Sequence, residues 1–239
     1  MALPKLETPT YIMKVPSTGE EIKFRPFLVK EEKILLLAQE EQDEGATYQG
    51  VLDLVKACTF GNVGNKTDPM FDIEYAFLKI RQKSISETVD VKMLCPDDEV
   101  TYVDVTINLE DITVTMDDKH SKICNLGKDS KGNEVSMELD YPNVASTLES
   151  SGKNSIDSIF SVIKNCISSI QFGDDVYNKV DITSEEIEDF VDSLTQDQFV
   201  NLQDFFETMP KLTHDVEIVN PKTGVKSTVH LEGLNNFLS

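Results

Sequence analysis

Apolar and polar residues alternate through three closely spaced stretches, TVDVKM (residues 88–93), TYVDVTI (101–107) and ITVTM (112–116). Alternation places successive side chains on opposite faces of a strand, and β-branched residues favour strands. Because one face of each strand is polar, we expect a mostly antiparallel sheet with one solvated face. Short strands at residues 122–124 and 134–139 extend it.

The sequence upstream of these strands predicts a hairpin followed by helices. Turn residues at 16–19 separate two short alternating stretches, which indicates a β-hairpin. Apolar residues at three- and four-residue steps then predict three helices, over residues 29–42, 48–60 and from Pro69 onward. Gly45 is the expected stop of the first helix, and Asp68 is the expected N-cap of the third.

The helical period returns downstream of Pro142. One apolar stripe predicts a helix that ends near Gly173, and its members are Ile156, Ile159, Phe160, Ile163, Ile167 and Ile170. Thr183 and Thr195 each precede Glu or Gln by three residues, the capping-box pattern that begins a helix. A hairpin with its turn at residues 220–224 closes the chain.

These patterns predict an α+β protein in three segments. Residues 1–86 hold the N-terminal hairpin and helices, and residues 87–141 form the central, mostly antiparallel β region. Residues 142–239 hold the C-terminal helices and the closing hairpin. We expect this last segment to pack with residues 1–86 as one helical domain.

The charge excludes several classes of partner. The 239 residues include 43 Asp and Glu against 22 Lys and Arg, which gives a net charge of -21. Phosphate backbones and anionic lipid surfaces repel such a chain, so we expect neither nucleic-acid nor membrane binding. A basic protein partner is compatible with it. The sequence contains no apolar stretch long enough to span a bilayer and no apolar core of a signal peptide at its start, so we expect a cytoplasmic protein.

Few residues are suited to catalysis or metal binding. Cys124 and His120 are four residues apart and suggest a cysteine hydrolase, but no third group or oxyanion loop accompanies them. His214 and His230 flank the last hairpin, where they could face each other and form a weak metal site with Asp215. A solvated pair is the simpler interpretation. We therefore expect no catalytic residue, no metal and no cofactor. A carbohydrate-binding sheet is disfavoured because the chain has no Trp.

Apolar residues near both ends of the chain suggest contacts with a partner. They either fasten the chain to itself, as a hydrophobic staple does, or dock on another polypeptide. In the second case Arg25 would pair with a partner's carboxylate. The candidate partner-binding residues are Phe24, Arg25, Phe27, Leu28, Leu234, Phe237 and Leu238.

The same two regions carry a resemblance to a known family. The stretch KFRPFLVKEEKILL (23–36) resembles the N-terminal signature of T4-like phage baseplate proteins, a family of hub subunits and hub assembly proteins of contractile-tailed phages. Near the other end, FF (205–206), MPKL (209–212), His214 and GLNNF (233–237) are similar to its C-terminal signature.

The resemblance implies a non-enzymatic role in assembly of the central hub of the baseplate. The chain would act there as a hub subunit or an assembly factor, in contact with other hub proteins. An assembly chaperone that is absent from the mature virion is the alternative. The expected location is the host cytoplasm during assembly, and the virion baseplate if the chain stays. The family has no catalytic residues to carry over, and the terminal turn lacks the cysteine that a zinc site would need. The sequence does not decide whether the chain forms homo-oligomers.

Overall fold

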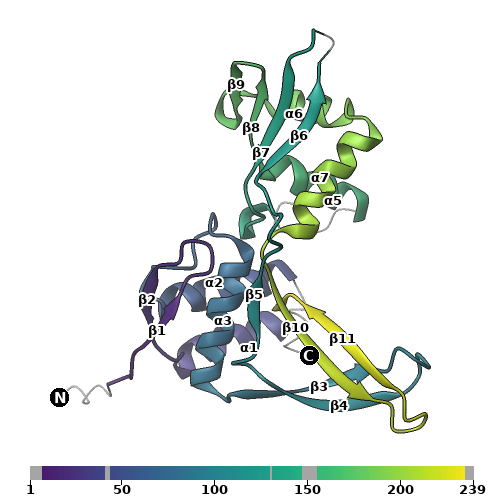
Figure 1. Ribbon diagram of the computed structural model, residues 1–239. Helices are drawn as coiled ribbons and strands as arrows, with labels where there is room; N and C mark the ends of the chain where they lie inside the picture. Colours follow the sequence, from purple (N-terminus) through teal and green to yellow (C-terminus); the bar gives the residue numbers. More distant parts are fainter. Residues whose placement is uncertain (1–6, 41–43, 130, 147–154, 235–239) are drawn as a thin grey trace, which may run out of the picture. The chain divides into compact units, whose positions relative to one another are not determined.

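The computed structural model describes residues 7–40, 44–129, 131–146 and 155–234. Helices and antiparallel strands form several separate sheets in these ranges (Figure 1), which confirms the predicted α+β class. The chain divides into two compact units. Unit 1 comprises Met1–Thr115 and Lys211–Ser239, and unit 2 comprises Met116–Pro210.

Unit 1 begins with the predicted hairpin. Strands β1 (Tyr11–Lys14) and β2 (Glu21–Phe24) pair antiparallel. Helices α1 (Val29–Glu40), α2 (Glu44–Cys58) and α3 (Met70–Ser84) follow. The core of unit 1 includes both faces of α3, as expected for a central helix; its buried apolar residues are Phe71, Ile73, Ala76, Phe77, Leu78 and Ile80.

Two predicted helix boundaries are wrong. Gly45 lies inside α2, which begins at Glu44. Glycine is inexpensive there because the first turn of a helix makes few intrahelical hydrogen bonds to lose. Asp68 does not cap α3, whose N-cap is Pro69. The Asp68 carboxylate instead accepts hydrogen bonds from the backbone N–H groups of Gly64 and Asn65, both at 2.9 Å.

At Gly64 the backbone of the loop between α2 and α3 lies directly against the backbone of α2. Its φ is +109°, in the region that favours glycine. A Cβ atom at this position would lie 2.6 Å from the backbone nitrogen of Lys56. No other residue fits there without displacing the backbone of α2.

The strands of unit 1 lie in separate small sheets. Strands β3 (Thr88–Leu94) and β4 (Tyr102–Asn108) pair antiparallel, with Thr88 opposite Asn108. A second sheet has the order β11-β10-β5 and consists of β5 (Thr113–Thr115), β10 (Lys211–Val219) and β11 (Lys226–Glu232). Antiparallel pairing and the closing hairpin are therefore confirmed, but the expected central sheet is divided, because β5 pairs with a strand from the far end of the sequence.

The turns of two hairpins in unit 1 are tied together by one carboxylate. Asp97, between β3 and β4, accepts hydrogen bonds from the side-chain amide of Asn220 at 2.9 Å and from the hydroxyl of Thr223 at 2.6 Å. These bonds hold the pKa of Asp97 below its usual value. The β3–β4 and β10–β11 hairpins are thereby fixed to each other.

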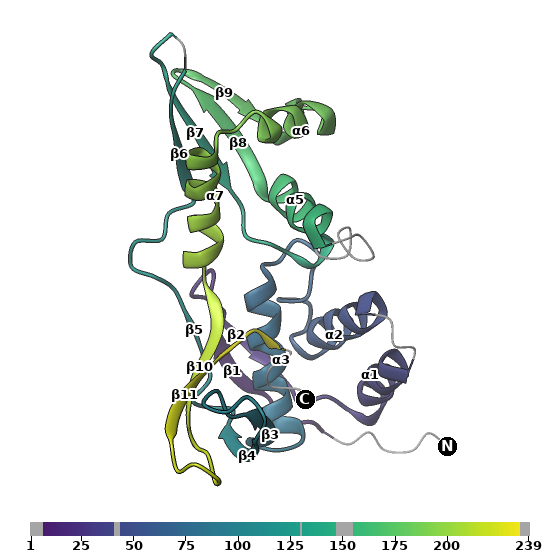
Figure 2. The same cartoon turned by 90° about the vertical axis from the view of Figure 1, so that its right-hand side faces the viewer.

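Unit 2 contains a four-stranded antiparallel sheet and helices. Figures 1 and 2 show β6, β7 and β8 side by side. The sheet has the order β6-β7-β8-β9, with β6 (Ile123–Lys128), β7 (Glu134–Leu139), β8 (Ile167–Phe172) and β9 (Asp175–Asn178). Its helical elements are α5 (Ser155–Cys166), the 3-10 helix η1 (Lys179–Asp181), α6 (Ser184–Asp192) and α7 (Gln196–Thr208).

The prediction of one helix that reaches Gly173 is wrong. Helix α5 ends at Cys166, and β8 continues directly from Ile167 to Phe172. The sequence ISSIQF has apolar residues three apart, which fits a helix, but it also offers a strand that β7 can pair with, and Ile170 lies opposite Met137. Pairing to an existing strand outweighs a weak local helical preference.

Both predicted capping boxes are confirmed in unit 2. The Thr183 hydroxyl accepts from the N–H of Glu186, and the Glu186 carboxylate accepts from the N–H of Thr183. Thr195 and Gln198 make the same reciprocal pair at the start of α7.

The core of unit 2 lies between the sheet and the helices. It gathers buried residues from β6, β7 and β8 and from α5, α6 and α7; they are Cys124, Leu126, Val135, Met137, Leu139, Ile163, Cys166, Ile167, Ile170, Ile187, Val191, Leu202 and Phe205.

The compact units differ from the three segments expected at residues 1–86, 87–141 and 142–239. The closing hairpin joins the N-terminal half in unit 1, whereas α6 and α7 belong to unit 2. The boundaries lie where strand pairing changes partner, at Thr115 and Lys211, rather than where the sequence period changes.

Candidate functional site

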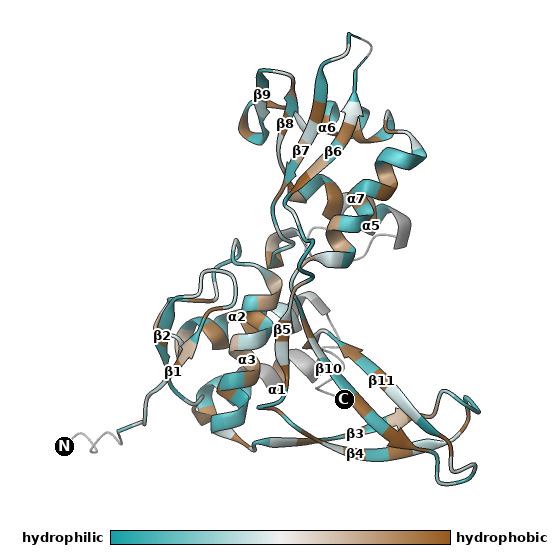
Figure 3. Cartoon of the chain, in the orientation of Figure 1, coloured by the Kyte–Doolittle hydropathy of each residue, from teal (hydrophilic) through white to brown (hydrophobic). Residues whose placement is uncertain are grey.

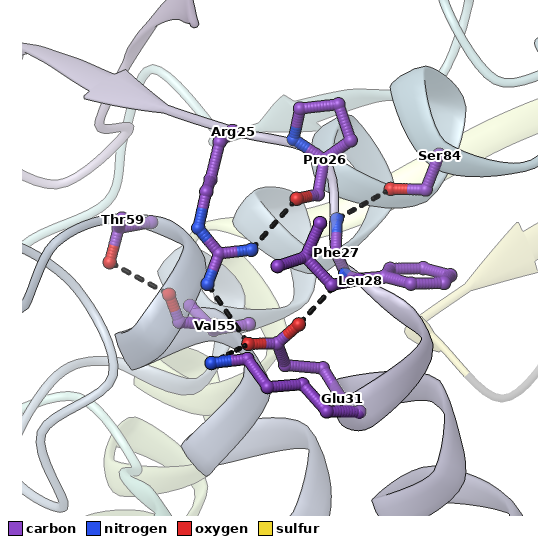
Figure 4. Close-up of polar contacts among 9 residues, drawn as sticks. Arg25, Pro26, Phe27, Leu28, Glu31, Val55, Thr59 and Ser84 are labelled. Carbon is purple, nitrogen blue, oxygen red and sulfur yellow. Dashed lines mark hydrogen bonds and ion pairs between the residues drawn. The ribbon is translucent and has the colours of Figure 1, made fainter. Parts of the chain in front are cut away.

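The junction between β2 and α1 is built around a buried ion pair (Figure 4). The guanidinium of Arg25 lies 2.9 Å from Oε1 of Glu31, and the two side chains are 13% and 4% exposed. Arg25 also donates to the carbonyl of Pro26 at 2.9 Å. The second carboxylate oxygen of Glu31 accepts from the backbone N–H of Leu28 at 2.7 Å. Glu31 thus caps the start of α1 and neutralises Arg25 at once.

The pKa of Glu31 shows that this arrangement favours the charged carboxylate. Burial raises this pKa, but hydrogen bonds from Arg25, the Leu28 N–H and Lys30 outweigh burial, so the pKa lies below its usual value. Arg25 therefore has a carboxylate partner within its own chain, whereas the docking alternative had paired it with a partner protein's carboxylate.

The junction is also fastened to α2 and α3. The Arg25 N–H donates to the carbonyl of Cys58 at 3.0 Å. The Phe27 N–H donates to the Ser84 hydroxyl at 3.0 Å, and that hydroxyl donates to the carbonyl of Ile80 (Figure 4 draws the first of these two bonds). These contacts make the junction a fixed corner of unit 1.

The candidate residues at this corner divide into buried and exposed ones. Phe24 is buried, which corrects its expected exposure, and its ring packs 5.6 Å from that of Tyr11, centroid to centroid. Phe27 is half-buried, whereas Leu28 is exposed. The hydrophobic-staple interpretation thus fits Phe24, and Leu28 keeps a surface position.

Helix α1 extends this exposed apolar surface. Val29 is 80% exposed, and Leu36 and Leu37 are exposed further along the same helix. We call Leu28, Val29, Leu36 and Leu37 the α1 surface. Leu36 and Leu37 were not among the residues predicted from the sequence, because they lie in an apolar block that suggests a core. The signal was available in the charged residues on both sides of the block, which leave α1 no clean polar face.

At the C-terminal end, Leu234 is buried in unit 1. Its N–H donates to Oε1 of Glu74 on α3 at 3.2 Å, and the N–H of Gly233 donates to the carbonyl of Leu212. The pKa of Glu74 is raised to about 7, because burial and, to a smaller extent, the charge of Glu232 outweigh the hydrogen bond from Leu234. Leu234 is therefore an internal anchor, so of the two alternatives for these apolar residues it fits the one in which they fasten the chain to itself rather than dock on a partner. Phe237 and Leu238 lie outside the described residues.

The Cys124 and His120 pair does not have the geometry of a dyad. Burial raises the pKa of the Cys124 thiol to about 11, so the thiolate that a nucleophile needs is not populated near neutral pH. His120 lies against the rings of Tyr141 and Phe205, and its Nδ1 is 2.9 Å from the Thr208 hydroxyl. Burial lowers the pKa of His120. Both side chains serve the packing of unit 2.

His214 and His230 do not face each other across the last hairpin, as the possible metal site would have required. His214 lies opposite Leu231, and His230 lies opposite Asp215. Nδ1 of His230 is 2.6 Å from a carboxylate oxygen of Asp215, and both side chains are exposed. Within the described ranges, no group of three or more His, Cys, Asp or Glu residues is placed to hold a metal ion.

The remaining thiols are also protected. Burial raises the pKa of Cys58 to about 11 and that of Cys166 to about 12, and it raises the pKa of Cys95 as well.

Across the part of the chain that the structure describes, no helix is both long and apolar enough to cross a bilayer.

Comparison with known proteins identifies one family. The family model described as T4 bacteriophage base plate protein matches residues 8–239 of this chain. Searches of curated proteins and of solved structures gave no significant match.

Proposed function

The chain belongs to the T4 bacteriophage base plate protein family, and we propose that it helps to build the central hub of the baseplate through contacts with other hub proteins. It acts as a hub subunit or an assembly factor and performs no covalent chemistry. Its place is the host cytoplasm during assembly and the tail baseplate if it remains in the particle.

The α1 surface is the observation that carries this proposal. Leu28 and Val29 lie at a corner that the Arg25–Glu31 pair and the contacts to Ser84 and Cys58 hold in place, and Leu36 and Leu37 lie further along the same helix. Exposed apolar residues gathered on one element mark contact sites for other proteins. A fixed corner lowers the entropy that binding costs, because the contact residues are already in position. The resemblance to the family signature, residues 23–36, covers this same corner.

The chemistry of the described residues supports a binding role. The four cysteines are buried with raised pKa values, and His120 lies in a packed aromatic cluster. An enzyme of the cysteine type needs a thiolate next to a histidine with access to substrate. Contacts with other polypeptides need no such group.

Co-purification with hub proteins tests the proposal. The double variant Leu36→Asn with Leu37→Asn should lose most of the hub proteins that the unaltered chain retains from infected cells. Ile85→Asn is the matched control, since Ile85 is equally exposed in unit 1 but lies just beyond α3. Equal retention by the double variant and the control would contradict the role of the α1 surface, and an unaltered chain that retains no baseplate protein would contradict the proposed function.

The choice between subunit and chaperone needs a separate measurement. Mass spectrometry of purified tails should find the chain in stoichiometric amount if it is a hub subunit. Its absence from tails, together with its presence in assembly intermediates, would identify a chaperone.

A further inference from the structure

We propose that an apolar hollow between α5 and α7 of unit 2 receives a basic segment of another baseplate protein, with apolar side chains in the hollow and Lys or Arg around it. This inference rests on the proposed function and adds a second contact surface of defined chemistry. It involves unit 2, whereas the α1 surface belongs to unit 1.

The hollow has a volume of about 420 Å³ and walls on two helices. Helix α5 contributes Ile159 and Val162, and α7 contributes Phe199 and Phe206. Residues three, four and seven apart share one face of a helix, so each helix presents apolar side chains to the hollow together with polar ones, Ser158 on α5 and Gln203 and Glu207 on α7. Figure 3 shows that apolar and polar residues are mixed along both helices, as expected for helices with a second, solvated face.

The floor of the hollow is part of the unit 2 core, and its rim reaches solvent. Ile163 is buried, and the rings of Phe160 and Phe199 stack at 5.6 Å between centroids, which fixes α5 against α7. At the rim Ile159 is 57% exposed. A large apolar side chain in this position gains from burial only if another molecule covers it.

Charge selects the kind of partner. Helix α7, one wall of the hollow, has the sequence QDQFVNLQDFFET, which contains Asp and Glu but no Lys or Arg. Glu207 of α7 lines the hollow itself. Lys164 of α5 is paired with Glu188 of α6 at 3.1 Å, so it is engaged within the unit. Complementary charge speeds association and rejects partners of like charge. The partner segment is therefore basic.

The same charge argues against a second copy of this chain. The protein carries a net charge of -21, and a copy that docks through this surface would bring acidic helices against acidic helices. An acidic segment of any other protein meets the same repulsion. A segment with apolar side chains flanked by Lys or Arg matches both the apolar lining of the hollow and the acidic residues around it.

Site-specific cross-linking in the full chain tests the inference. A photo-reactive amino acid replaces Gln203, which is exposed and lines the hollow, and the cross-linked peptide is sequenced from baseplate intermediates of infected cells. We expect a peptide of another baseplate protein in which apolar residues are flanked by Lys or Arg. Ile159→Asn should lower the yield of this product about tenfold, since a buried Ile side chain contributes about that factor or more to affinity. Glu207→Lys should lower it as well.

Val180→Asn is the matched control, because Val180 is an apolar residue of unit 2 that is 91% exposed on η1, away from the residues that line the hollow. A cross-link to this chain itself, to a second copy or to an acidic segment would overturn the inference. So would equal yields from Ile159→Asn and Val180→Asn. A fall in melting temperature for Ile159→Asn alone would also overturn it, because Ile159 would then be a core residue.

The outcome also separates this inference from the proposed function. If Ile159→Asn retains baseplate proteins as fully as the unaltered chain, only the role of the hollow fails. If the unaltered chain retains none, the proposed function fails.

Discussion

Replacement of Glu74 by Gln should stabilise unit 1 at alkaline pH. The side chain of Glu74 is half-buried on α3, and its carboxylate accepts a hydrogen bond from the N–H of Leu234. Burial raises its pKa from 4.5 to about 7. Gln keeps an oxygen that can accept the same hydrogen bond, but it carries no charge that burial would penalise.

The sign of the effect follows from proton binding. Between pH 4.5 and pH 7 the folded chain keeps a proton on Glu74 that the unfolded chain releases. Stability therefore falls as pH rises through this window, and the full penalty is present above pH 7. A rise in the pKa of Glu74 from 4.5 to about 7 corresponds to about 3.4 kcal/mol, at about 1.36 kcal/mol for a tenfold change in proton affinity. Because the side chain keeps partial contact with solvent, screening reduces the expected penalty to about 1–2 kcal/mol.

Thermal unfolding at several pH values measures the difference. At pH 8, Glu74→Gln should raise the melting temperature of unit 1 by about 2–8 °C, since 1 kcal/mol shifts a domain of this size by about 2–4 °C. Near pH 4.5 the variant and the unaltered protein should melt together. Glu110→Gln is the control, because Glu110 is an exposed carboxylate of the same unit. A constant difference between Glu74→Gln and the unaltered protein at all pH values would refute the reasoning, because it would mean that the carboxylate does not titrate differently in the folded state.

Three further substitutions have defined outcomes in denaturant unfolding. Glu31→Ala should lower the free energy of unfolding by about 3–5 kcal/mol, since it leaves the partly buried Arg25 charge without its carboxylate. Glu32→Ala is the control and should change little, because Glu32 is exposed. Similar losses of stability from both would contradict the role of the ion pair. Gly64→Ala should lower the free energy of unfolding by several kcal/mol, because its Cβ would meet the backbone of α2. Gly61→Ala should cost clearly less, since Gly61 also has a positive φ but has open space around the Cβ position. An equal cost would contradict the role of the close approach and leave positive φ as the cause. Thr195→Ala removes a helix cap and should cost about 1 kcal/mol in unit 2, and an unchanged midpoint would show that Gln198 or water replaces the cap.

Local signals in the sequence predicted the elements that local chemistry specifies. The capping boxes at Thr183 and Thr195 depend only on residues three apart, so the pattern and the structure agree. The first and last hairpins follow in the same way from alternation around turn residues. The hydrogen bond from the Leu28 N–H to Glu31 could also have been predicted, because a Glu at the third position of a helix can accept from the backbone N–H of its N-cap residue.

Signals that depend on distant partners could not be read from one sequence. The stretch ISSIQF has no strong preference, and it became β8 because β7 offers a strand to pair with. The burial of Phe24 and Leu234 could not be predicted for the same reason. Phe24 lies between two charged residues and Leu234 between two polar or small ones, and only the packing of unit 1 decides that both are buried.

The arrangement of β5 and β10 explains how one chain holds two units. Thr115, the last residue of β5, lies opposite Lys211, the first residue of β10, so the chain leaves unit 1 and returns to it at paired positions of one sheet. The two ends of an inserted segment lie close together when they join adjacent strands of one sheet. The entropy lost on bringing these ends together grows only slowly with the length of the inserted segment. Unit 1 can therefore keep its pairing whatever unit 2 contains, and each unit can carry its own contact surface. A protein whose proposed work is to join several others gains from this division, because the α1 surface and the hollow in unit 2 are each held by a separate core.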